Sequence, residues 1–227
     1  MTFQYFGHSC FQLQIGDQTI LVDPFISPNP LAQGIDLRNL CPNFILVSHG
    51  HGDHVADLIT IATQSDATVI ANYEIAEWAK SKGVKNAIGM NTGGVLTTAF
   101  GKVRLTNAVH SSVLPDGSNG GNPNGFLIHT AEGNLYYAGD TALHMDMQLI
   151  PLWAPQLDVA ILPIGDHFTM GVEDAIMAAQ WTKAKKVIPV HYNTFPPITI
   201  DTEKAQEQFA SARIELRFCP LQEIVVL

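Results

Sequence analysis

The chain has 227 residues, of which 46% are hydrophobic, and its net charge is −9 with histidine counted as neutral. This length allows one large domain or two small ones and is sufficient to bury a sizeable core. The acidic balance disfavours nucleic-acid binding, which would need clustered basic residues, and Lys185-Lys186 is the densest basic spot. Apolar runs such as Val159–Leu162 are far too short for a membrane span, so none is expected.

The cysteines indicate a reducing compartment. The sequence has three cysteines, Cys10, Cys41 and Cys219. Their odd number, their wide spacing and the absence of a CxxC motif argue against a disulfide framework. No charged and then apolar leader precedes the first predicted strand, which already begins at Phe3. We therefore expect a cytoplasmic protein.

Strands dominate the first part of the chain. Apolar runs predict them at Phe3–Phe6, Phe11–Ile15, Thr19–Val22, Phe44–Val47 and Thr68–Ala71. Helical spacing of apolar residues predicts a helix over Val55–Thr63, and a second helix begins after Asn72 as N-cap and ends at Gly83. A hairpin-like pair, Leu96–Phe100 and Val103–Val109, follows.

Residues 111–125 are rich in glycine, asparagine and proline. A flexible surface loop is one interpretation. A loop over a functional site is the favoured one, because long loops inside compact domains usually serve function or are disordered. Beyond it, the predicted strands are Phe126–Thr130, Leu135–Ala138, Asp158–Ile164, Val187–Val190, Ile214–Phe218 and Glu223–Leu227, the last two closing the sheet. Helices are predicted over Val172–Lys183 and from Asp201 to Ala212.

The stretch 48–54 contains four candidate metal ligands within six residues, His49, His51, Asp53 and His54. It directly follows the predicted strand that ends at position 47. Side chains alternate in an extended turn, so His49 and His51 point to the same side and can share one ion. Asp53 and His54 begin the following helix and turn away, which suits a second ion. Imidazole and carboxylate without thiolate favour zinc, manganese or iron. A histidine-rich surface loop is the plainer alternative, but the flanking strand and helix supply the context that such a motif requires.

This pattern resembles the signature of the metallo-β-lactamase superfamily, and the similarity extends over essentially the whole chain. That family adds a histidine after a later strand, a bridging aspartate in a Gly-Asp-Thr turn and a final histidine, and the matching positions are His110, Asp140 and His191. The segments Gly7–Cys10 and Gly120–Phe126 are similar to those of small bacterial and archaeal metal-dependent hydrolases. These are related to the ascorbate-phosphate lactonase and to the phospholipase D that cleaves N-acyl-phosphatidylethanolamine.

The resemblance implies an α/β (α+β) fold, namely an αβ/βα four-layer sandwich formed by a single domain over residues 1–227. Strands flanked by helices in both halves fit this arrangement, with the ligands in the cleft where the sheets meet. Asp23 ends a strand that this fold usually brings to the site. An ordinary turn residue before Pro24 is an equally good interpretation of Asp23.

The resemblance also implies the ligand set. His49, His51 and His110 would hold the first ion, Asp53, His54 and His191 the second, and Asp140 would bridge the two. Asp53 and Asp140 are the expected catalytic carboxylates. Water bound to the metal would have its pKa lowered toward ~7, so hydroxide could attack an ester, lactone, amide or phosphodiester without a protein nucleophile. Two divalent ions are expected, zinc first, with manganese or iron as alternatives.

Three further histidines are candidate substrate-binding residues. His8, His144 and His167 lie in loops at strand ends in the neighbourhood of the family's active site, whereas His129 is more consistent with a structural or surface role. If they line the pocket, a small anionic substrate is expected. Homo-oligomerisation stays open.

Two other functions fit the sequence less well than hydrolysis. A di-iron redox protein of the same superfamily would generally have glutamate in place of His51 and a flavin-binding domain. A non-catalytic binding or regulatory protein would not be expected to keep the complete ligand set. A true β-lactamase is disfavoured as well, because that branch is exported and commonly places cysteine on the second ion. The fold alone does not decide function, so the hydrolase prediction depends on the seven ligands.

Overall fold

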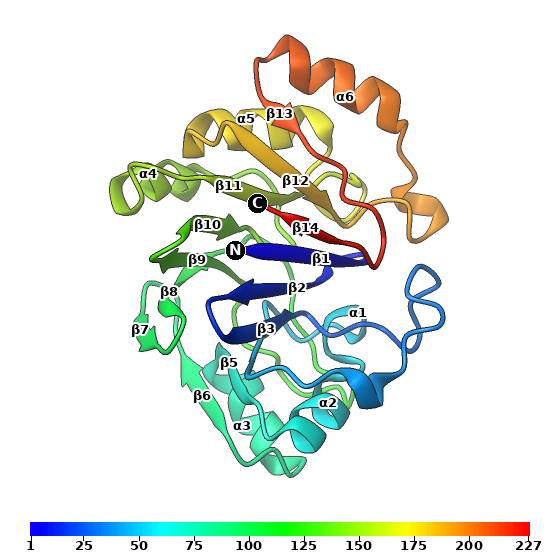
Figure 1. Ribbon diagram of the computed structural model, residues 1–227, viewed down its shortest axis with the longest axis vertical. Coiled ribbons are helices and arrows are strands. Elements are labelled where there is room, and N and C mark those ends of the chain that lie inside the picture. The colour runs from blue at the N-terminus through cyan, green and yellow to red at the C-terminus, as the bar shows by residue number, and fades with distance from the viewer.

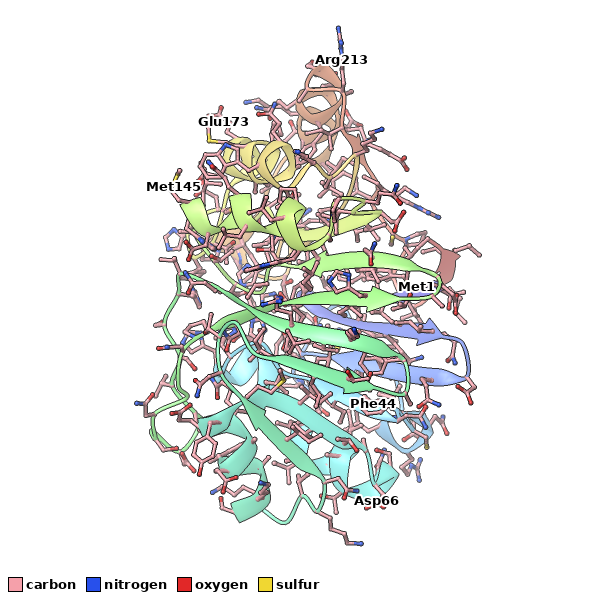
Figure 2. All side chains as sticks on the ribbon, turned by 90° about the vertical axis from the view of Figure 1, so that its left-hand side faces the viewer. Met1, Phe44, Asp66, Met145, Glu173 and Arg213 are labelled. Carbon is pink, nitrogen blue, oxygen red and sulfur yellow. The ribbon has the colours of Figure 1, made fainter.

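Two seven-stranded sheets pack face to face, and helices cover their outer faces, in the computed structural model of residues 1–227 (Figure 1). Helices α5 (Val172–Thr182) and α6 (Thr202–Ser211) lie at one end of this view, and α2 (Leu58–Ser65) and α3 (Tyr73–Ser81) lie at the other. Figure 2 shows the same layers after a quarter turn, with Glu173 and Arg213 near one end and Asp66 near the other. The predicted αβ/βα sandwich is therefore confirmed.

The first sheet has the order β14-β1-β2-β3-β4-β5-β6, and its strands are β1 Thr2–Gly7, β2 Cys10–Ile15, β3 Gln18–Val22, β4 Phe44–Leu46, β5 Thr68–Asn72, β6 Ala87–Met90 and β14 Ile224–Val226. The second has the order β13-β12-β11-β10-β9-β8-β7, formed by β7 Val95–Thr98, β8 Gly101–Asn107, β9 Asn124–Thr130, β10 Gly133–Tyr137, β11 Val159–Pro163, β12 Lys186–Val190 and β13 Glu215–Leu216. The short helices are α1 Gly52–Val55 and α4 Ile150–Trp153, with 3-10 turns at Leu37–Asn39, Met145–Leu149 and Pro196–Ile198. None of the helices combines the length and apolarity needed to cross a bilayer.

The alternation of side chains along each strand builds three apolar layers. On β9, Phe126 and Ile128 enter the core between the sheets, and Leu127 between them packs under the helices of the second sheet. On β3, Val22 enters the same central core, and Leu21 packs on the opposite face toward α2 and α3. Both faces of the sheets are thus buried, which explains why their strands are almost continuously apolar.

The parallel strands place the ligand-bearing turns together. Strands β3, β4 and β5 are parallel in the first sheet, as are β10, β11 and β12 in the second. The carboxyl ends of neighbouring parallel strands lie at the same edge of a sheet. The turn that carries His49 follows β4, Asp140 follows β10, and His191 follows β12.

The structure differs from the predicted elements at several places. The helix predicted over Val55–Thr63 is two helices, because the Asp57 carboxylate leaves the helix to accept hydrogen bonds from the backbone amides of Ile26 (2.7 Å) and Ser27 (2.8 Å). Strand β6 and helix α4 were not predicted. The two final strands do not close one sheet, since β13 pairs with β12 and β14 pairs with β1.

Candidate metal centre

The seven predicted ligands meet at one edge of the two sheets. Their ligand atoms, together with that of His8, form three overlapping groups in which all atoms lie within 4.8 Å of one another. The groups are His49, His51 and His110; His49, His54 and Asp140; and His8, Asp53, His54 and His191. The first and third groups correspond to the two ion sites that the sequence predicts, with His8 added to the second.

The turn after β4 brings the first two histidines together. His51 is in an extended conformation and forms the N-cap of α1. Nε2 of His49 and Nδ1 of His51 lie 2.9 Å apart, as expected for side chains on the same side of an extended turn. Glycine suits position 50, because a Cβ there would lie 3.2 Å from the Leu114 side chain and 3.3 Å from Cα of Gly120. Both lone pairs can therefore face one ion.

Asp140 lies between the two groups of ligands. Its Oδ2 is 3.0 Å from Nε2 of His191, 3.2 Å from Nε2 of His54 and 3.8 Å from Nε2 of His110. Burial alone would raise the pKa of this carboxyl, but the charges of His191 and His54 hold it well below its usual value. The preceding Gly139 has φ of +66°, and a Cβ there would lie 2.6 Å from the carbonyl oxygen of Asn124. Glycine thus permits the turn that points Asp140 inward.

Asp23 lies behind the ligands and orients one of them. This buried carboxylate accepts hydrogen bonds from Tyr137 Oη (2.6 Å) and from Ser48 Oγ (2.7 Å), and its Oδ2 is 2.9 Å from Nδ1 of His54. Nε2 of His54 is buried without a hydrogen bond. With Nδ1–H donated to Asp23, the Nε2 lone pair faces the site, as in metal-bound histidines generally. The interpretation of Asp23 as a residue of the site is thus favoured over that of a simple turn.

The electrostatics of the imidazoles suit metal binding. Burial lowers the pKa values of His49, His51 and His110, so their nitrogens carry lone pairs at neutral pH. Burial also opposes the charged form of His54, but Asp140 and Asp23 outweigh it and raise the pKa of His54 well above its usual value. Without metal, a proton on His54 therefore compensates the neighbouring carboxylates. An orphaned imidazole nitrogen and a donor set of imidazole and carboxylate fit divalent ions such as zinc.

The three predicted substrate-binding histidines lie in different surroundings. His8 is buried in the ligand cluster, with both ring nitrogens near protein partners, Thr194 Oγ1 at 3.0 Å and Asp53 Oδ2 at 3.2 Å. His144 belongs to none of the ligand groups, and it lines a cavity of about 210 Å³ together with Trp153. His167 is exposed in the loop after β11 and is also outside the ligand groups.

The segment 111–123 contacts the histidine motif. Ser112 Oγ accepts a hydrogen bond from the amide of Gly50 (3.1 Å), and Ser111 Oγ lies 3.3 Å from Nε2 of His51. Asn72, at the start of α3, donates from Nδ2 to the carbonyl oxygens of Gly120 (2.6 Å) and Asn122 (2.9 Å). The segment is therefore bonded both to the site and to the neighbouring helix.

Known proteins resemble this chain over its whole length. The profile described as "Beta-lactamase superfamily domain" matches residues 2–191. A UPF0173 metal-dependent hydrolase of Methylacidiphilum infernorum is 47% identical over 227 residues, and one of Flavobacterium johnsoniae is 44% identical over 227 residues, each covering 100% of both chains.

Among solved structures, Igni18, described as a novel metallo hydrolase from the hyperthermophilic archaeon Ignicoccus hospitalis, superimposes with a TM-score of 0.88 at 34% identity. The alignment covers 99% of this chain and 97% of Igni18. The chain therefore belongs to the metallo-β-lactamase superfamily and, within it, to the UPF0173 metal-dependent hydrolases.

Proposed function

We propose that this metal-dependent hydrolase uses two divalent ions per chain, zinc in the first place and manganese or iron as alternatives. The observation that supports two ions is the division of the ligands into two groups with Asp140 Oδ2 between them. His49, His51 and His110 would hold one ion, and Asp53, His54 and His191 the other. The three cysteines are unpaired, which suits the reducing cytoplasm that we propose as its compartment.

The chain's own residues would orient the ions and manage protons. When bound, the ions supply Lewis acidity and make water a competent nucleophile near neutral pH. Asp140 would connect the two ligand groups, because its Oδ2 lies 3.2 Å from Nε2 of His54 in one group and 3.8 Å from Nε2 of His110 in the other. Asp53 has a side chain that is 34% exposed, so water can reach it, and we propose it as the acceptor of a proton from the attacking water. We assign the catalytic roles to these two carboxylates.

The proposed reaction is hydrolysis of an ester, lactone, amide or phosphodiester in a small molecule. Both ring nitrogens of His8 have partners inside the protein, and His144 lies in a separate cavity outside the ligand groups. We propose His167, whose exposed ring lies in the loop before α5, as the residue that would give a preference for an anionic substrate.

A panel of lactones, phosphodiesters, acyl-amides and thioesters tests this proposal. We expect the zinc-loaded protein to hydrolyse at least one class, and both chelation and the Asp140→Ala substitution to abolish that turnover. The circular dichroism spectrum of Asp140→Ala should remain that of the wild type, because the ligand lies on a turn outside the central core. Equal turnover by the chelated protein would contradict the proposal.

A further inference from the structure

His8 connects two ligands of the proposed second ion. Its backbone carbonyl accepts hydrogen bonds from the amide of His191 (2.7 Å) and from Tyr5 Oη (2.7 Å). The rings of His8 and His191 lie 4.2 Å apart between centroids, and Nε2 of His8 is 3.2 Å from Asp53 Oδ2. One residue in the turn between β1 and β2 therefore contacts two ligands, Asp53 in the helix after β4 of the first sheet and His191 after β12 of the second.

The turn holds His8 in an unusual conformation. Its φ is +58°, which few residues other than glycine adopt. The preceding Gly7 has φ of +98°, and a Cβ there would lie 2.6 Å from Cβ of Leu31. Strained backbone of this kind persists where surrounding contacts fix it, and it often marks functional sites. Here the positive φ of His8 places its imidazole within 3.2 Å of the Asp53 carboxylate.

The hydrogen bonds determine where the proton of a neutral His8 ring lies. An unprotonated Nε2 would direct its lone pair at the Oδ2 lone pairs of Asp53 only 3.2 Å away, which is repulsive. The proton is therefore on Nε2, which donates to Asp53. Nδ1 is then the acceptor, and Thr194 Oγ1, at 3.0 Å, donates to it. Hydrogen bonds are therefore donated in one direction, from the Thr194 hydroxyl to His8 and from His8 to the Asp53 carboxylate.

The apolar surroundings of His8 strengthen its hydrogen bonds with Thr194 and Asp53. Its side chain is fully buried, and the rings of Phe25 and Phe195 each pack edge-on at 5.4 Å between centroids. Hydrogen bonds in such apolar surroundings are stronger than in water. Asp53 by contrast has a partly exposed side chain whose carboxylate makes no other hydrogen bond, so little else restricts its rotation.

We propose that His8 is a positioning residue for the second ion: its Nε2–H holds Asp53 Oδ2 and so presents Oδ1 of Asp53 to the metal. This inference rests on the two-ion site of the proposed function and adds His8 and Thr194 to it. Residues that orient a ligand in this way typically contribute about 10- to 100-fold to metal affinity. A substitution of His8 should therefore change the metal affinity of the second site and not that of the first.

Two substitutions separate the hydrogen bond from the shape of the turn. The amide nitrogen of His8→Gln reaches about as far as imidazole Nε2 and can still donate to Asp53. The amide of His8→Asn reaches only toward Thr194, yet asparagine tolerates positive φ better than glutamine does. Backbone strain would therefore harm the glutamine variant more, whereas loss of the Asp53 bond would harm the asparagine variant more. His129→Asn, on β9 and bonded to Asn134, is the matched control.

Zinc titration against a competing chelator, which needs no substrate, gives the two dissociation constants. We expect His8→Asn to weaken the second ion about 10- to 100-fold and to leave the first unchanged. His8→Gln should restore most of that loss, and His129→Asn should match the wild type. In the zinc-loaded wild type, the ¹⁵N shifts of His8 should report the Nε2–H tautomer.

The inference is overturned if both His8 variants bind two ions as tightly as the wild type. It is also overturned if both lose the second ion equally, since His8 would then act through the shape of the turn. A wild-type protein that binds a single ion would instead contradict the two-ion proposal itself. Thermal unfolding of each variant verifies that it is folded before titration.

Discussion

A single buried carboxylate, Asp23, organises the residues behind the metal ligands. It accepts hydrogen bonds from three directions, one of them from Tyr137 on the other sheet. The backbone amide of Ser48 also donates to its Oδ1 at 2.7 Å, which fixes the start of the turn that bears His49. Asp23 has φ of +45°, so the chain reverses sharply to bury its side chain. The orientation of His54 is thus set by a residue that is outside the ligand groups.

We expect Asp23→Asn to weaken the ion held by His54 by about 10- to 100-fold, because the amide no longer compels His54 to donate from Nδ1. The metal-free variant should also lose about 3 kcal/mol of unfolding free energy, since the buried hydrogen-bond network loses its charged acceptor. Zinc titration and urea unfolding measure the two effects. Asp36→Asn, whose partner Arg38 is on the surface, is the control. Wild-type zinc affinity in Asp23→Asn would contradict this role.

At the scale of elements, helix α3 anchors the segment 111–123. Asn72 caps the helix by accepting from the amide of Ile75 (2.9 Å), and its Nδ2 group donates to two carbonyls of that segment. Trp78 Nε1 on α3 donates to Asp116 Oδ2 at 2.8 Å. The segment therefore cannot leave the metal site without breaking bonds to the helix, although its composition suggests flexibility.

Asn72→Asp separates the two roles of this side chain. Aspartate still caps α3 but has no donor for the carbonyls of Gly120 and Asn122, whereas Asn72→Ala removes both. We expect Asn72→Asp to increase amide hydrogen exchange at Leu114 and Gly120 while α3 keeps its protection. Asn72→Ala should lose a further ~1 kcal/mol of unfolding free energy, the usual contribution of an N-cap. Unchanged exchange at Leu114 in Asn72→Asp would show that the segment is held by other contacts.

At the scale of the whole molecule, much of the fold follows from local patterns. Apolar runs located the strands that carry the site, because both sheet faces are buried and the strands are therefore almost continuously apolar. The turn from position 48 to 54 could be recognised because its ligands are adjacent in sequence. Partnerships over long separations could not be predicted. Asp57 breaks a helix by bonding to residue 27, and Asp23 meets Tyr137 across the two sheets.

Contacts between distant residues also went unpredicted at His8 and at the chain ends. The position of His8 in a loop at a strand end predicted a site residue, but its pairing with Thr194 is visible only in three dimensions. The final strands, β13 and β14, are short and contain few buried residues, so nothing in their sequence indicated that they join different sheets.

The metal-free protein should lose stability on acidification. Burial lowers the pKa of His8 from 6.5 to about 4, so between these values the unfolded chain binds a proton that the folded protein does not. The contribution of this group is therefore complete above pH 6.5 and is lost as the pH falls toward 4, by about 3 kcal/mol. Burial lowers the pKa values of His49, His51 and His110 as well.

His54 acts in the opposite direction. Its raised pKa means that its contribution is complete below 6.5 and is lost as the pH rises through the folded value. Because four imidazoles with lowered pKa values, two buried and two half-buried, oppose one, we expect the urea midpoint of the metal-free protein to fall between about pH 7 and about pH 4.5. The variant His8→Gln should show a weaker dependence. A midpoint that rises on acidification would contradict this assignment.

The number of ions per chain tests the central claim most directly. Protein purified without chelator, and metal-free protein reconstituted with zinc and then desalted, can be measured by elemental mass spectrometry against protein concentration. Two separate ligand groups around Asp140 predict close to two equivalents in the reconstituted protein. One equivalent, or none after zinc is added, would contradict the proposed two-ion site.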